Sequence, residues 1–142
     1  MLKKILLSLV GTGVFYGTAC LLNIKLSIVF LAILIYILPM VFNIIMELLY
    51  PAKKKYQNDC IVAGITVIGY LVFGVTMMNQ SGFSDYIVKN SVSAGDMYFS
   101  ISSNLIHFPQ LLFVFILNFG VLYLVQLFME GKKKHVKGSK FK

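Results

Sequence analysis

The chain has no arginine and few other side chains suited to acid–base or phosphate chemistry. Its 142 residues include five acidic residues and two histidines, and charged residues make up 13% of it, about half the share of an ordinary soluble domain. Membrane enzymes that act on headgroups need several such residues together. No glycine-rich phosphate loop, Ser/His/Asp set or metal-spaced histidine pair occurs. The sequence therefore predicts a protein that is not an enzyme and binds no cofactor.

Cysteine is also scarce. Cys20 and Cys60 are the only two, and neither belongs to a Cys-x-x-Cys pair or to a cluster with metal-ligand spacing. In the topology that the lysines predict, the two lie on opposite sides of a membrane, farther apart than the roughly 4.4–6.8 Å between the Cα atoms of a disulfide. We therefore expect two free thiols and no metal site.

What the chain has in abundance is uninterrupted apolar sequence, and hydrophobic residues make up 58% of it. Blocks of roughly 18 or more apolar residues indicate membrane-spanning helices. Four such blocks occur, at about residues 5–22, 26–50, 60–78 and 105–129. Pro39 predicts a kink near residues 35–39, and Asn58 or Asp59 is expected to cap the third helix. We predict an all-α integral membrane protein, a single-domain four-transmembrane-helix bundle over residues 1–142.

The lysines orient this bundle. Lys53–Lys55 and Lys132–Lys134 each follow an apolar block, and such clusters mark the cytoplasmic end of a membrane helix. With both termini cytoplasmic, eleven of the thirteen lysines lie inside and only Lys25 and Lys89 lie outside. The net charge of +8 then favours contact with an anionic inner leaflet. Binding of nucleic acid by the basic cytoplasmic tail 131–142 is the weaker interpretation, and we expect no nucleic-acid partner.

Lysine without arginine, together with abundant Ile, Asn and Phe, is typical of an AT-rich bacterial source. The predicted location is therefore the cytoplasmic membrane of a bacterium. An alternative for the first block is a cleaved signal, because the basic start, the apolar stretch and Cys20 resemble the layout of a lipoprotein leader. Gly17 replaces the larger aliphatic residue of such sites, and Leu21 and Leu22 continue the apolar run. We expect the first span to be retained.

Polar side chains inside the spans are the candidates for function, because burying them in hydrocarbon costs free energy. Asn43 and Glu47 lie one turn apart on the second helix. Glu47 is expected at the inner interface, paired with a lysine of 53–55. Asn118, nearer mid-membrane in the fourth helix, predicts a hydrogen bond between helices, and Gln126 predicts a polar inner rim.

Two further features indicate contact surfaces. Gly13 and Gly17 form a Gly-x-x-x-Gly motif, which lets two helix backbones approach closely, with the neighbour in the same chain or in another. The outer loop 79–104 is long for so small a protein. Its apolar residues predict a short interfacial helix and a second patch, which either cover the end of the bundle or form a contact surface for a partner: Phe83, Tyr86, Ile87, Tyr98 and Phe99.

Two classes of function remain. In the first, a non-catalytic small membrane protein acts by helix packing and outer-loop contacts, as an accessory subunit of a membrane complex or as an immunity-type protein against a membrane-active toxin. Its partner is another membrane protein or a second copy. In the second, an oligomeric small transporter or pore uses Asn43, Glu47, Asn118 and Gln126. Side chains that face one cavity favour the pore, and side chains that face each other favour the first class, which we expect.

Overall fold

The computed structural model describes residues 2–51, 55–94, 97–99 and 102–138, which form helices and one small β-hairpin. Within these ranges, four helical segments are long and apolar enough to cross a membrane. They are Leu2–Lys25, Ile28–Leu49, Tyr56–Met78 and Phe108–Glu130. Each overlaps one of the predicted spans, so the prediction of a helical protein with four apolar spans is confirmed.

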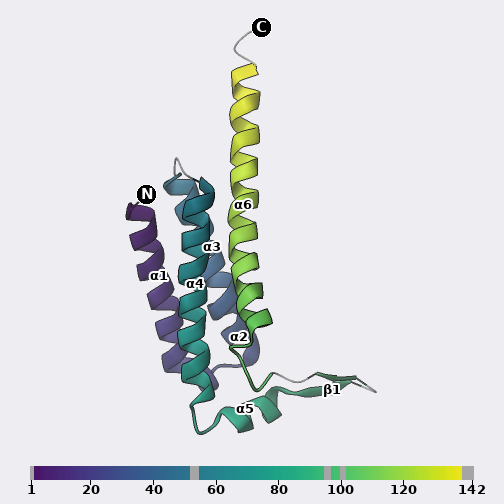
Figure 1. Ribbon diagram of the computed structural model, residues 1–142. Coiled ribbons are helices and arrows are strands. Elements are labelled where there is room, and N and C mark those ends of the chain that lie inside the picture. Colours follow the sequence, from purple (N-terminus) through teal and green to yellow (C-terminus); the bar gives the residue numbers. More distant parts are fainter. Residues whose placement is uncertain (1, 52–54, 95–96, 100–101, 139–142) are drawn as a thin grey trace.

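The elements follow one another from a first spanning helix to a long last one (Figure 1). Their bounds are α1 (Leu2–Leu22), the 3-10 turn η1 (Asn23–Lys25), α2 (Ile28–Ala32), the π-helical turn η2 (Ile33–Ile37), α3 (Leu38–Leu49), α4 (Lys55–Met78), α5 (Phe83–Asn90), β1 (Val92–Ala94), β2 (Met97–Phe99) and α6 (Phe108–Gly138). Two boundaries differ from prediction. Helix α4 begins before Asp59, which therefore caps nothing, and α6 continues through Gly138 into the segment predicted as a tail.

Helices α1 and α6 each contact both α3 and α4, so every spanning helix has two neighbours in the bundle. Figure 1 shows the start of α1 and the carboxyl-terminal part of α6 at one end, which we call the terminal end. Helix α5 and strand β1 lie at the opposite end, which we call the hairpin end. Four successive passes along the length of the bundle produce this arrangement, because an even number of passes returns the chain to the end at which it started.

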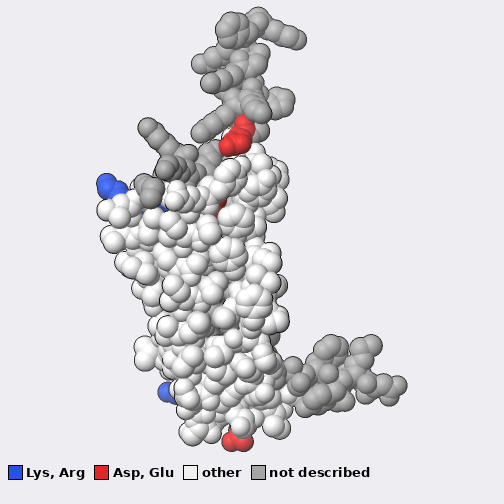
Figure 2. All heavy atoms as spheres, viewed as in Figure 1, with Lys and Arg blue, Asp and Glu red and all other residues white. Residues whose placement is uncertain are grey.

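The outer surface between these ends is apolar. Figure 2 shows charged side chains near the two ends of the viewed face and none along its middle. Large apolar side chains from all the spanning helices are more than half exposed there, among them Leu6, Val14, Phe30, Ile68 and Ile116. Apolar surface of this extent is unfavourable in water and is what the hydrocarbon of a bilayer solvates.

The predicted irregularity near Pro39 takes the form of the π-helical turn η2, which ends two residues before the proline. Proline has no N–H to donate to the carbonyl four residues earlier, which belongs to Ile35. The hydroxyl of Tyr16 on α1 donates to this carbonyl at 2.8 Å. A neighbouring helix thus satisfies the backbone group that proline leaves free, as an apolar surrounding requires.

Close helix approach occurs at glycines other than the predicted pair. A Cβ at Gly69 would lie 2.6 Å from the Tyr16 ring, and a Cβ at Gly11 would collide with the Phe42 ring. A Cβ at Gly13 or Gly17 would meet nothing within 4 Å. Among the described residues, the Gly-x-x-x-Gly motif therefore packs against no other helix, and both of its glycines are exposed.

The segment 79–104 contains the predicted short helix, α5, followed by an antiparallel hairpin that pairs Val92 with Phe99. Phe83 and Tyr86 are buried in the hydrophobic core, and Ile87 packs against it. These three side chains cover the end of the bundle, which corrects their alternative assignment to a partner surface. Tyr98 and Phe99 lie in strand β2, and their side chains are outside the described part of the chain.

Candidate functional site

The interior of the bundle is more polar than its surface. Helix α1 buries a polar side chain at every fourth position, which places all of them on one face: Lys4, Ser8, Thr12 and Tyr16. Helix α6 places polar side chains on its inner face at every eighth position, at Gln110, Asn118 and Gln126. Since lipid solvates only the outside of such a protein, these groups must satisfy one another inside it.

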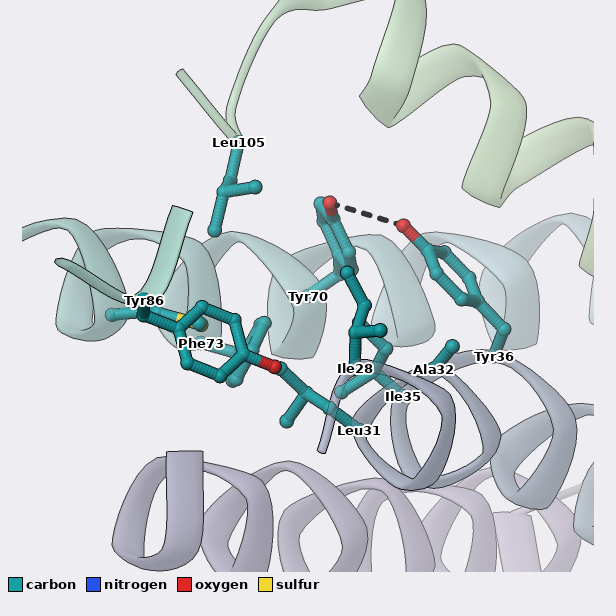
Figure 3. Close-up of a pocket in the computed structure, with 10 residues that line it drawn as sticks. Ile28, Leu31, Ala32, Ile35, Tyr36, Tyr70, Phe73, Tyr86 and Leu105 are labelled. Atoms are coloured by element: carbon teal, nitrogen blue, oxygen red, sulfur yellow. Dashed lines mark hydrogen bonds between the residues drawn. The ribbon is translucent and has the colours of Figure 1, made fainter. Parts of the chain in front are cut away.

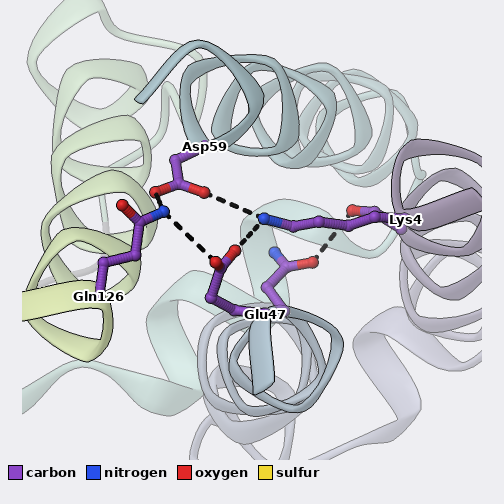
Figure 4. A network of polar contacts seen from close by, with 6 residues as sticks. Lys4, Glu47, Asp59 and Gln126 are labelled. Carbon is purple, nitrogen blue, oxygen red and sulfur yellow. Dashed lines mark hydrogen bonds and ion pairs between the residues drawn. The ribbon is translucent and has the colours of Figure 1, made fainter. Parts of the chain in front are cut away.

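Nearest the terminal end, four helices contribute one side chain each to what we call the charged layer: Lys4, Glu47, Asp59 and Gln126 (Figure 4). The Lys4 ammonium forms ion pairs with Glu47 Oε2 and, at 3.0 Å, with Asp59 Oδ1. Gln126 Nε2 donates to Asp59 Oδ2 and lies 3.4 Å from Glu47 Oε1. One ammonium and one amide thus hold two carboxylates from helices α3 and α4 together.

This layer corrects the predicted pairing of Glu47. Among the described side chains its partner is Lys4 of the first helix, whereas the side chains of lysines 53–55 lie outside the described part of the chain; the carboxylate is 1% exposed instead of lying open at an interface. Two charges taken out of water lose several kcal/mol of hydration each, which ion pairing and hydrogen bonds together must offset. The layer therefore holds the four helices in one fixed arrangement, because any rotation of one helix leaves a buried charge unpaired.

A second set of polar groups, the amide layer, lies on the next turns of the same helices: Ser8, Asn43, Thr66 and Asn118. Asn43 is its centre. Its Oδ1 accepts a hydrogen bond from Ser8 at 3.0 Å, and its Nδ2 donates to Thr66 at 3.1 Å and to Asn118 at 3.3 Å. Asn118 thus makes the predicted hydrogen bond between helices. Interhelical bonds of this kind contribute about 0.6–2 kcal/mol each.

Toward the hairpin end the polar groups are phenols beside an apolar pocket. Tyr36 donates to the Tyr70 hydroxyl at 3.3 Å and accepts from Gln110. A pocket of about 110 Å³ lies between the α2–η2 segment and α4, and Tyr86 of α5 and Leu105 line it as well (Figure 3). The Tyr86 hydroxyl has no hydrogen-bond partner among the described residues. Burial raises its pKa above the ordinary value, so it remains a neutral phenol.

The structure thus brings together all four predicted intramembrane residues, in two adjacent layers of one chain. Sequence reasoning missed two members of the charged layer, Lys4 and Asp59, because both lie near a predicted helix end where a charge is ordinarily solvated. The usable signal was the four-residue spacing of polar side chains in α1, from Lys4 to Tyr16, which fixes the buried face of that helix.

The site holds no group of ligands typical of a metal. Among the residues that the structure describes, no three His, Cys, Asp or Glu side chains lie close enough to bind an ion together. Both cysteines are free thiols, with Cys60 exposed. Comparisons with protein families, with curated proteins and with solved structures find no match.

Proposed function

We propose that the protein is a non-catalytic component of a bacterial cytoplasmic membrane, with both termini in the cytoplasm. It binds another membrane protein, as an accessory subunit or as an immunity-type protein against a membrane-active toxin. The observation that carries this proposal is the mutual pairing of the buried polar side chains. Asn43 bonds to Asn118, and Gln126 contacts Glu47, within a single chain. Side chains used in this way stabilise helix packing.

The exposed face of α1 supports a partner in the membrane. Gly13 and Gly17 lie there, and a Cβ added at either glycine would have no neighbouring atom within 4 Å. Val10 and Val14 beside them are more than half exposed. Small residues four apart let a second helix approach closely, and the van der Waals contact so gained drives association in lipid. The partner is therefore expected to present a spanning helix to this face.

The transporter or pore remains the alternative. It requires Asn43, Glu47, Asn118 and Gln126 to line a shared path between subunits, whereas each is at most 3% exposed and pairs inside one chain. Flux of ions through liposomes that contain the purified protein, lost in the Glu47→Gln variant, would support the alternative instead.

Capture of the partner tests the proposal. Tagged protein is purified from its native membrane in mild detergent, and co-purifying proteins are identified by mass spectrometry. A stable membrane partner is expected with the wild type and with Glu47→Gln, and Gly17→Leu should reduce its recovery at least tenfold because the larger side chain blocks helix approach.

The matched control is Gly120→Leu on α6, since Gly120 is also a helical glycine with no atom within 4 Å of its Cβ position. It should retain the partner. Equal recovery from wild type and Gly17→Leu, or equal loss from both leucine variants, would contradict a contact surface on α1.

A further inference from the structure

The charged layer carries an excess negative charge when all of its groups are ionised. Lys4 supplies one positive charge, and Glu47 and Asp59 supply two negative charges, with no side chain of the three more than 1% exposed. The fourth member, Gln126, is neutral. Among the described residues, no other charged side chain pairs with these carboxylates. A net charge buried in this way is costly, and the usual outcome is that one group becomes neutral.

The side chains that the structure describes around the layer include no second cation for it. On α1, Lys3 is exposed, away from the interior. On α3 and α4, the neighbouring buried polar residues are Asn43 and Asn58, which are neutral. On α6, the next acidic residue is Glu130, one helical turn beyond Gln126. Within the described part of the chain, the two carboxylates are therefore balanced by one ammonium only.

Unpaired polar atoms belong to Gln126 of the layer and to Asn58, the residue that precedes Asp59 in α4. Gln126 is 3% exposed, and its Oε1 has no hydrogen-bond partner among the described residues; Asn58, next to Asp59, lacks partners for both Oδ1 and Nδ2. Figure 4 shows the Gln126 side chain reaching into the layer from α6. A carboxylate only accepts hydrogen bonds, whereas a protonated carboxyl also donates one. Rotation of the Gln126 amide about its last bond exchanges donor for acceptor, so this residue suits both states.

We propose that the charged layer is a proton-binding site in which Glu47 and Asp59 hold one exchangeable proton between them. A proton from water adds to one carboxylate oxygen and forms a neutral carboxyl group. The other carboxylate remains paired with the Lys4 ammonium, and no other covalent bond changes. Release of the proton restores two like charges, which face each other from α3 and α4 across the interior of the bundle, and their repulsion destabilises the packing at the terminal end.

Infrared spectroscopy of the whole protein in lipid nanodiscs tests this site, because the carbonyl band of a protonated carboxyl group is separate from the bands of a carboxylate. Exposed carboxyl groups ionise at about pH 4 and give no such band at neutral pH. The wild type is therefore expected to show at neutral pH the band of one carboxyl group, from the proton that Glu47 and Asp59 share. Glu47→Gln and Asp59→Asn should each abolish it, since the remaining carboxylate then pairs one to one with Lys4. The Asp85→Asn variant, at an exposed position of α5, should leave it unchanged.

Three results would overturn the proposal: no such band in the wild type at neutral pH, a band that survives both Glu47→Gln and Asp59→Asn, or a band whose pH midpoint moves with sodium at constant ionic strength. The last would identify a metal cation as the ligand. Circular dichroism and a monodisperse elution profile establish that each variant is folded. Because Glu47→Gln keeps the pair of Lys4 with Asp59, it tests the site even if Asp59→Asn fails to fold.

Discussion

Lys4 illustrates how far the role of one residue depends on the helices around it. In the sequence it is one of two adjacent lysines before an apolar span. In the structure Lys3 is exposed and Lys4 is 1% exposed, bound to carboxylates of two other helices. One position along a helix changes direction by about 100°, so the packing of α1 turns Lys4 inward and Lys3 outward.

The Lys4→Met variant is expected to be less stable by about 3–5 kcal/mol, because removal of one partner leaves buried charge without compensation. Lys3→Met should change stability by less than about 0.5 kcal/mol, as for other exposed positions. The free energy of unfolding in detergent micelles, measured by titration with a denaturing detergent, gives both values. Similar values for the two variants would show that Lys4 is solvated.

Glu47→Gln is expected to be milder than Lys4→Met, because Lys4 and Asp59 still form a balanced pair at 3.0 Å. In the double variant Lys4→Met with Glu47→Gln, the loss of unfolding free energy should differ from the sum of the two single losses, since the residues are in contact. The same titration measures this coupling. Additive losses would mean that the ion pair contributes nothing to the fold.

At the scale of elements, the second span depends on the first. Pro39 leaves the Ile35 carbonyl without its helical donor, the π-helical turn η2 precedes it, and Tyr16 of α1 supplies the missing hydrogen bond. The Tyr16 ring also lies where a side chain at Gly69 of α4 would stand. One tyrosine therefore fixes the relative position of three spanning segments.

Tyr16→Phe should lower the free energy of unfolding by about 1–3 kcal/mol, because it leaves the buried Ile35 carbonyl without a hydrogen-bond partner. Tyr123→Phe, on the exposed face of α6, is the matched control and should be nearly neutral. In a Pro39→Ala background the restored N–H can serve the Ile35 carbonyl, so the cost of Tyr16→Phe should fall by at least half. An unchanged cost in that background would show that the hydroxyl has another function.

Helix positions were predictable from this sequence, whereas their mutual rotation was not. The four spans, the irregularity before Pro39 and the short helix α5 follow from apolar run length, proline chemistry and local periodicity. The partner of Glu47 does not, since a lysine eight residues away and one forty-three residues away look equally suitable in sequence. Likewise, the spacing of Gly13 and Gly17 says nothing about which side of α1 faces the bundle.

Two local features were also beyond sequence reasoning. The strands β1 and β2 are three residues each, too short for a recognisable alternation of apolar and polar residues. The continuation of α6 to Gly138 places four lysines in a helix that length and composition alone end near residue 130. Lysine is a good helix former, so an apolar span can extend into a basic segment without a break.

For the whole molecule, the distribution of polarity is that of a protein solvated by lipid: apolar outside, with paired charges and amides inside. The charged layer lies near the terminal end, where the start of α1 meets the later part of α6 (Figure 1). If this end faces the cytoplasm, the charged layer lies closer to the cytoplasm than to the exterior, and protons reach it over a shorter distance from the cytoplasm. The α5 segment with its hairpin then faces outward.

The orientation of the bundle, with both termini in the cytoplasm, is the central claim about the whole molecule, and cysteine labelling in intact cells measures it most directly. Single cysteines are introduced as Lys3→Cys and Asp85→Cys, both at exposed positions, after replacement of Cys20 and Cys60 by alanine. A membrane-impermeant maleimide should label the Asp85→Cys variant in intact cells and the Lys3→Cys variant only after permeabilisation. Labelling of Lys3→Cys in intact cells, with Asp85→Cys protected, would contradict the account.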